Sequence, residues 1–382
     1  MLYRLISMIL SMLILGGCSA EDISKAKSNI DESLENAVET HQITESGKAI
    51  IEEAVDTEIQ RIEEQQKAAE EAAKEAEKHK TIKLSVAGDC LLAAHKGVVK
   101  AGNFASKALE HDWEYFLDGV DEIFEADDFT IVNLECVLSD KKLSPAKKSS
   151  TPAYWYIGPT ENTNILTSQS VEICNLSNNH TGDYGTQGAQ DTIDAVVNAG
   201  MLYGNNDKTC YFEKYGFKIA LICNGLWYEG QETQIINRLH EAEKQSDFQI
   251  VYYHGGKERI NKPEDWKIRA SRRIVDAGAD LVIGNHPHVI QPMEEYNGVL
   301  IVYSMGNFVF GDEAHPQNRT IILTSDININ TETKEAESVD NNIIPCYIYT
   351  GERNQWQPTV IPDGADKQRV LDFMNWKVDK PL

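Results

Sequence analysis

The stretch ADLVIGNHPHVIQP, residues 279–292, joins an apolar run to two histidines that are separated by one proline. The apolar part is typical of a buried strand, and His286 and His288 follow at the point where that strand should end. A second run, VEICNLSNNH at residues 171–180, repeats this arrangement. Apolar strands that end in polar side chains are typical of an α/β domain whose site lies at the strand ends.

The segments around this stretch continue the same pattern. Further strands are predicted for residues 81–88, 129–135, 217–225, 248–256 and 298–310. Helices are predicted for residues 185–200 and 265–278, each ending at a glycine. Residues 319–330 and 341–351 alternate polar and apolar side chains, which predicts antiparallel strands of the same domain. We therefore expect one α/β domain over residues 81–382.

Oxygen and nitrogen ligands follow most of these strands. They are Asp89, Glu135, Asn178, Asn179, His180, His254, His286 and His288. Imidazole and carboxylate groups suit divalent Mn, Fe and Zn, and a shared carboxylate can bridge two ions roughly 3.5 to 4 Å apart. One histidine at a strand end is more often a hydrogen-bonded structural residue. Their joint occurrence predicts a metal site.

Five motifs resemble those of the CapA/PgsA family, the poly-γ-glutamate capsule synthesis proteins. They are AGDCLL (87–92), NLECVL (133–138), NLSNNHTGDYG (175–185), YYHGGKE (252–258) and the block from GADLVIGNHPHV to YSMGNFVF (278–310). The resemblance covers about Thr81 to Thr324. That family is related to the calcineurin-like metallophosphatases. The resemblance therefore implies a double-sheet β sandwich flanked by helices, with two metals at its edge.

The resemblance also implies a role for each ligand. One metal would be held by Asp89 and His288, the other by Asn179, His254 and His286, and Glu135 would bridge them. Two cations lower the pKa of water and so supply a nucleophile at neutral pH. His180 would then be the proton donor, and Asp183 would orient it. Asn178, Asn285, Ser304 and Asn307 would support the metal ligands, and Ser304 and Asn307 are expected to do so through hydrogen bonds.

The chain departs from the metallophosphatase pattern at three positions. Leu91 stands where those enzymes usually place a histidine ligand, so one metal site is short of a ligand. Glu135 replaces the usual bridging aspartate, and the segment YYHGGKE has Gly256 after HG where relatives often have HWGxE. Glu258 is retained as a candidate substrate or supporting group.

Other features leave alternatives open. Cys90 and Cys136 each follow a proposed ligand, so they could form a disulfide or remain buried thiols. The insertion at residues 139–156, with Lys147 and Lys148, is either a solvated loop or a cover over the site.

Composition excludes several classes of protein. The 382 residues carry 36 basic and 60 acidic side chains, and the net charge of -24 repels nucleic acid. The seven cysteines form no CxxC pair, which excludes a zinc ribbon.

The first 20 residues resemble a bacterial lipoprotein signal. An apolar run ends in LGGC at residues 15–18, similar to a lipobox, so Cys18 is expected to carry lipid at the mature N-terminus. An ordinary signal peptide and an uncleaved anchor are the alternatives. In each case we expect an extracytoplasmic protein, and with the lipid a membrane-anchored one.

Residues 21–80 form a different segment. They contain 17 acidic and 8 basic residues and no proline, and their Ala/Glu/Lys-rich end favours helix. Apolar residues recur at helical spacing at Ile30, Leu34, Val55 and Ile59. This pattern predicts a helical stalk, either a solvated spacer or a coiled coil that oligomerises.

Two functions are compatible with these features. One is an exported hydrolase or transferase with two divalent metal ions, acting on an anionic polymer or on a phosphate or amide bond during capsule assembly. The other is a non-catalytic scaffold of a membrane polymer synthase complex, with a degenerate metallophosphatase fold.

Overall fold

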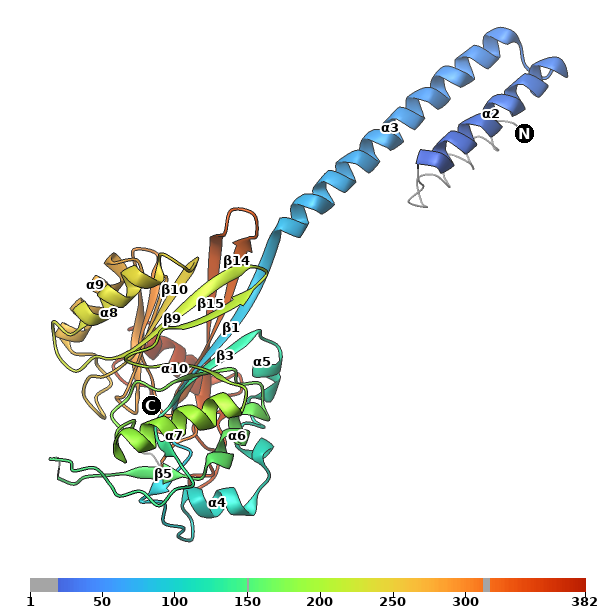
Figure 1. Cartoon of the computed structure of the whole chain (residues 1–382). Helices are drawn as coiled ribbons and strands as arrows, with labels where there is room; N and C mark the ends of the chain where they lie inside the picture. The colour runs from blue at the N-terminus through green and yellow to red at the C-terminus, as the bar shows by residue number, and fades with distance from the viewer. Residues whose placement is uncertain (1–19, 150, 312–316) are drawn as a thin grey trace. The chain divides into compact units, whose positions relative to one another are not determined.

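The computed structural model describes residues 20–149, 151–311 and 317–382, which form two compact units divided after His79. Figure 1 shows both units. The predicted signal segment and Cys18 lie outside the described residues. Within the described residues, no helix is both long enough and apolar enough to cross a membrane.

The first unit is a pair of helices, α2 (Ala20–Glu39) and α3 (Glu45–Lys78). Thr44 begins α3 by accepting a hydrogen bond from the backbone N–H of Gly47, a typical N-cap. The two helices bury one shared set of apolar side chains: Ile23, Ala26, Ile30, Leu34, Val55, Ile59 and Ile62. The predicted helical stalk is thus confirmed as helix, and its apolar stripe packs within a hairpin, which neither interpretation of the stalk included.

The second unit contains a seven-stranded sheet in the order β16-β15-β14-β1-β3-β6-β7. Its strands are β1 (His79–Cys90), β3 (Phe129–Leu134), β6 (Ile173–Asn175), β7 (Leu202–Gly204), β14 (Thr320–Asn330), β15 (Glu335–Tyr347) and β16 (Thr359–Val360). The strands β1, β3, β6 and β7 are parallel, so their carboxyl ends reach the same edge of the sheet.

A six-stranded sheet follows the order β12-β13-β11-β10-β9-β8. Its strands are β8 (Cys210–Lys214), β9 (Phe217–Gly225), β10 (Phe248–His254), β11 (Leu281–Asn285), β12 (Ile290–Tyr296) and β13 (Val299–Met305). A small sheet joins β2 (Ala94–His95), β5 (Tyr156–Gly158) and β4 (Val137–Leu138).

Helices cover the outer faces of the two large sheets. α8 (Glu232–Ala242) and α9 (Asp265–Asp276) share an apolar cluster with the six-stranded sheet, and Figure 1 shows them together beside β9 and β10. On the outer face of the seven-stranded sheet lie α4 (Phe104–Glu110), η1 (Trp113–Phe116), α5 (Asp121–Glu125), η2 (Thr160–Thr163), α6 (Asn164–Thr167) and α7 (Gly185–Asn198).

A third apolar cluster lies between the two sheets. It contains Val86 and Ile131 of one sheet and Ile250 and Ile283 of the other. The helix α10 (Ala365–Met374), which the sequence analysis did not predict, also contributes to this cluster through Phe373. The predicted double-sheet sandwich flanked by helices is confirmed. Its layers run helix, sheet, sheet, helix.

Candidate metal centre

The predicted ligands come from the carboxyl ends of strands in both large sheets. Asp89 is the penultimate residue of β1, and Glu135 directly follows β3, which runs parallel to β1. In the other sheet His254 ends β10, which is parallel to β11, and His286 directly follows β11. Because both sheets direct these ends to the same place, the side chains meet although they are far apart in the sequence.

One group of contacts centres on His254. Its Nε2 lies 2.8 Å from Asn179 Oδ1 and 3.1 Å from His286 Nδ1. The same nitrogen is 3.6 Å from Glu135 Oε1. These are the residues that the family resemblance assigns to the second metal, with Glu135 as the bridge.

A second group of contacts centres on His288. Its Nδ1 lies 3.4 Å from Asp89 Oδ2, and its Nε2 lies 3.8 Å from Glu135 Oε1. Ligand atoms of Glu135, His286 and His288 lie within 4.8 Å of one another, and so do those of Asp89, Glu135 and His254. Glu135 belongs to both sets, which is the position required of a bridging carboxylate.

The two carboxylates at the centre are fully buried and incompletely paired. Asp89 Oδ2 and both oxygens of Glu135 accept no hydrogen bond from the described residues. Burial, and after it the negative charge of Asp89, raises the pKa of Glu135 well above its usual value. Two adjacent buried carboxylates are costly unless they gain a proton or a cation. The donor set therefore fits a divalent metal ion.

The histidines are mostly held in the neutral form that ligates metals. Burial lowers the pKa of His254 well below its usual value and lowers that of His286 to about 2. For His288, burial acts in the same direction, but the close contact of its Nδ1 with Asp89 Oδ2 and the negative charge of Asp89 prevail and raise its pKa. Of these three imidazoles, His288 is thus the one whose protonated form the neighbouring carboxylate stabilises.

His180 lies at the edge of this cluster. Its Nδ1 is 2.8 Å from Asp183 Oδ2, and its Nε2 is 3.9 Å from Glu135 Oε1. The side chain of Asp183 is fully buried and also accepts a hydrogen bond from the backbone N–H of Tyr156. Asp183 therefore fixes the ring of His180 with Nε2 toward the centre.

The predicted supporting residues take different positions. Asn285 Nδ2 donates to Asp89 Oδ1 at 2.6 Å, and Ser304 Oγ lies 3.3 Å from Asn285 Oδ1. Asn178 Nδ2 donates to the carbonyl oxygen of Leu134, which fixes the turn before His180. Glu258 is half-exposed and lies 4.0 Å from His286 Nε2, at the outer side of the cluster.

The structure also reveals contacts that the sequence analysis did not assign. Asn133 Nδ2 donates to Asp89 Oδ1 at 2.6 Å and lies 3.2 Å from His254 Nδ1. The signal that could have identified Asn133 is its polar side chain within an otherwise apolar strand, two residues before Glu135. Trp227 stands edge-on to His286, with ring centroids 5.0 Å apart.

The insertion at residues 139–156 contacts the site through Lys148. The Lys148 ammonium forms an ion pair with Asp183 Oδ1, and it donates a hydrogen bond to the carbonyl oxygen of Tyr154 at 2.7 Å. At the insertion's end, the ring of Tyr156 packs edge-on against His180, with ring centroids 4.8 Å apart. Of the two alternatives for this insertion, the structure favours a loop bound to the site.

The backbone that carries two of the ligands is in an unusual conformation. His286 has φ of 97° and His288 has φ of 57°, values that residues other than glycine rarely adopt. Such strain is typical of functional sites, where the surrounding structure maintains it. Nearby, Cys90 and Cys136 are both free buried thiols.

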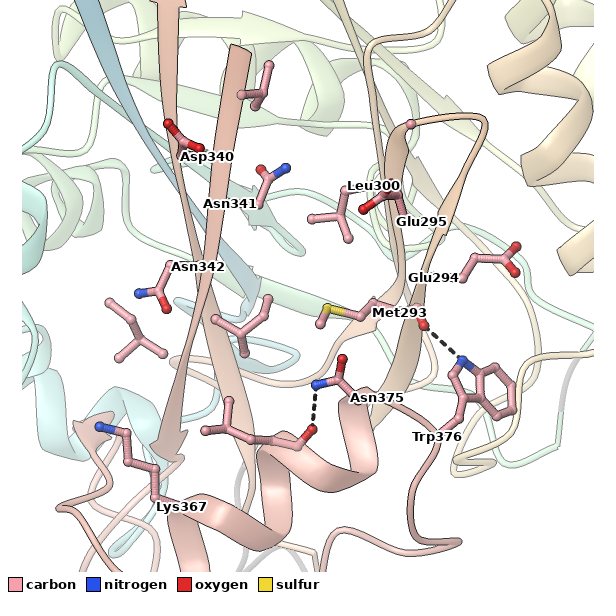
Figure 2. Close-up of a pocket in the computed structure, with 15 residues that line it drawn as sticks. Met293, Glu294, Glu295, Leu300, Asp340, Asn341, Asn342, Lys367, Asn375 and Trp376 are labelled. Carbon is pink, nitrogen blue, oxygen red and sulfur yellow. Dashed lines mark hydrogen bonds between the residues drawn. The ribbon is translucent and has the colours of Figure 1, made fainter.

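A cavity lies elsewhere in the domain. Figure 2 shows this space of about 840 Å³, between β12, β15 and α10. Trp376 Nε1 donates there to the carbonyl oxygen of Met293 at 2.8 Å. None of the predicted metal ligands lines this cavity. This cavity and the candidate metal centre are therefore separate sites.

Comparisons with known proteins agree with the motifs. The model of the family described as bacterial capsule synthesis protein PGA_cap matches residues 83–312. The PGA biosynthesis protein CapA of Bacillus subtilis (strain 168) is 30% identical over 245 residues, which are 58% of this chain and 64% of the relative. The capsule biosynthesis protein CapA of Bacillus anthracis is 29% identical over 223 residues, 52% of each chain. The match thus spans less than two thirds of either relative.

Among solved structures, a phosphatase from Mycoplasma pneumoniae aligns with 70% of this chain and 94% of its own. The sequence identity is 15% and the TM-score is 0.41.

Proposed function

The chain belongs to the bacterial capsule synthesis protein PGA_cap family, and from this membership we propose that it is an exported, lipid-anchored, metal-dependent hydrolase or transferase of capsular polyglutamate synthesis. One observation carries the catalytic part of the proposal. Asp89 and Glu135 are fully buried, Asp89 Oδ2 and both oxygens of Glu135 accept no hydrogen bond from the described residues, and imidazoles lie close to them. A scaffold has no use for such a costly arrangement.

We take the division of the ligands between two metal ions from the family resemblance, with Glu135 shared by both ions. Asp89 and His288 form one set, and Asn179, His254 and His286 form the other. We propose two divalent ions from among Mn, Fe and Zn, because these accept mixed nitrogen and oxygen ligands. When bound, such ions lower the pKa of water and polarise a phosphoryl or carbonyl oxygen of the substrate.

His180 provides the proton transfer in this proposal. Asp183 holds Nδ1, so Nε2 is the atom that takes up a proton and delivers it to the leaving group. Burial lowers the pKa of His180, and its ring is therefore neutral at rest. The substrate is an anionic polymer or a compound with a phosphate or amide bond, and the partner is a membrane polymer synthase complex.

A non-catalytic scaffold within that complex is the second candidate. The observation that favours it is Leu91, which occupies the position of a usual ligand and is buried among apolar side chains. A domain that lost one ligand could retain its fold and its partners without chemistry.

Replacing His180 by alanine distinguishes the two candidates. His180→Ala should retain both metal ions and the fold, yet lower turnover on phosphoester and amide substrates by roughly 10²- to 10⁴-fold and stop polymer production in cells. His240→Ala, an exposed position on α8, is the control. Full polymer output from His180→Ala at normal protein levels would overturn the catalytic proposal and leave the scaffold.

A further inference from the structure

Position 91 contributes nothing to the metal centre. The side chain of Leu91 is 1% exposed and packs in the apolar cluster between the seven-stranded sheet and its helices. Its backbone N–H donates to the carbonyl oxygen of Val309 at 2.7 Å. The metal site of Asp89 and His288 therefore requires another donor if it is to be complete.

The segment after β13 runs directly beside Asp89. The backbone N–H of Asp89 donates to the carbonyl oxygen of Gly306 at 3.0 Å, and the N–H of Phe308 donates to that of Asp89 at 2.8 Å. These bonds pair Asp89 with Asn307 in a parallel bridge. Paired residues of neighbouring strands project their side chains to the same face, so Asn307 and Asp89 point the same way.

A glycine makes this close approach possible. A Cβ atom at Gly88 would lie 2.0 Å from the carbonyl oxygen of Gly306, which is a severe clash. Any other residue at position 88 would therefore push the 306–309 segment away from Asp89. The sequence before the aspartate is thus adapted to the approach of Asn307.

The amide oxygen of Asn307 lies next to two of the proposed ligands. Asn307 is 2% exposed, and its Oδ1 lies 2.9 Å from His288 Nδ1. That nitrogen is 3.4 Å from Asp89 Oδ2, an oxygen that accepts no hydrogen bond from the described residues. Asn307 Oδ1, Asp89 Oδ2 and His288 Nδ1 therefore lie together, and the other ring nitrogen of His288, Nε2, is 3.8 Å from Glu135 Oε1.

We propose that Asn307 is the ligand that replaces the missing histidine, so that Asp89, His288, Asn307 and Glu135 hold one metal ion. This inference rests on the proposed metal function and makes the centre complete. Each ion would then have one asparagine amide oxygen, since Asn179 lies in the other set. With three oxygens and one imidazole, the Asn307 site should discriminate less against Mn²⁺ than the site that holds two imidazoles.

Metal stoichiometry of the full chain tests the ligand directly. Protein stripped with a chelator and reloaded with Mn²⁺ should hold two ions per chain, and Asn307→Ala should hold one or bind the second at least ~10-fold more weakly. Asn307→Asp keeps an oxygen donor and should hold two. The control is Asn354→Ala, because Asn354 is also buried and, among the residues that the structure describes, its side chain bonds only to the backbone of Phe310, Gly311 and Trp356.

A spectroscopic measurement separates a ligand from a mere hydrogen-bond partner. In Asn307→Cys loaded with Co²⁺, a thiolate bound to the metal gives a near-ultraviolet charge-transfer band, whereas wild type and Asn354→Cys should lack it. Two tightly bound ions in Asn307→Ala, or no such band in Asn307→Cys that holds two cobalt ions, would overturn the proposal. A wild-type protein without metal would instead refute the proposed metal function.

Discussion

His180 Nδ1 lies 2.8 Å from Asp183 Oδ2, and this contact directs His180 Nε2 toward Glu135. Asp183→Asn should keep the metal and the fold but lower turnover by about 10- to 100-fold, because an amide neither fixes the tautomer nor stabilises the protonated ring. The loss should be smaller than in His180→Ala, since the imidazole remains. Turnover of both variants, measured beside Asp191→Asn as a buried control, checks this order. A fully active Asp183→Asn would show that the contact is only structural.

The ion pair between Lys148 and Asp183 gives the second prediction. The Asp183 carboxylate is fully buried and the Lys148 side chain is 21% exposed. Lys148→Met therefore removes the cation that is paired with a buried carboxylate. We expect the free energy of unfolding to fall by about 1 to 3 kcal/mol, less than for a fully buried pair because water reaches the lysine. Denaturant titration measures this, and the exposed neighbour Lys147→Met should change it by less than about 0.5 kcal/mol. Equal effects of the two variants would contradict the prediction.

The sequence predicted most of the ligands because each one follows an apolar strand. Asp89, Glu135, His254 and His286 could be found in this way, since the carboxyl ends of parallel strands lie together. What strand ends do not reveal is contact between distant segments. The bond from Asn133 to Asp89 depends on the register of β1 and β3, which local patterns leave undetermined.

The stalk illustrates the same limit. Helical spacing of apolar residues predicted helix over residues 21–80, because periodicity is a local property, but it did not predict the turn between α2 and α3. The partner of an apolar stripe is not local, and Leu34 and Ile59 could equally have faced another chain. The ion pair between Lys148 and Asp183 could not be predicted either, because the sequence of a polar loop does not indicate which acidic residue a lysine will contact.

The helical hairpin gives the third prediction. Leu34 is fully buried between α2 and α3, so Leu34→Ala should destabilise the hairpin by about 2 to 5 kcal/mol. Ile50→Ala is the matched control, because Ile50 is 66% exposed. Thermal melting followed by helical circular dichroism should show a lower transition for Leu34→Ala alone. An unchanged melt would mean that this packing contributes little.

The location of the protein gives the fourth prediction. If Cys18 carries lipid, Cys18→Ala should release the protein from membranes and lose palmitate labelling. Ser19→Ala, the adjacent position, should do neither. Membrane fractions washed with carbonate and cells labelled with palmitate provide the measurement. A Cys18→Ala protein that stays in the washed membrane with full labelling would exclude the lipid anchor.

The dependence of metal binding on pH gives the fifth prediction. In the metal-free protein, burial and the charge of Asp89 raise the pKa of Glu135, and Asp89 likewise raises that of His288. A metal must displace these protons, so its affinity should increase with pH, by up to about tenfold per unit and per proton below the raised pKa. Calorimetric titration in buffers of different ionisation enthalpy counts the protons released.

Two variants make this measurement specific. Glu135→Gln removes the carboxylate, so the remaining binding should be weaker and should release fewer protons. Glu172→Gln is the control, because burial raises the pKa of Glu172 to about 7 although it bonds to the backbone N–H of Thr130, away from the ligands. Its proton release should equal that of wild type. If affinity instead stayed constant between roughly pH 5 and 8, the metal would not be competing with protons on Glu135 and His288, and the assignment of both as ligands would fail.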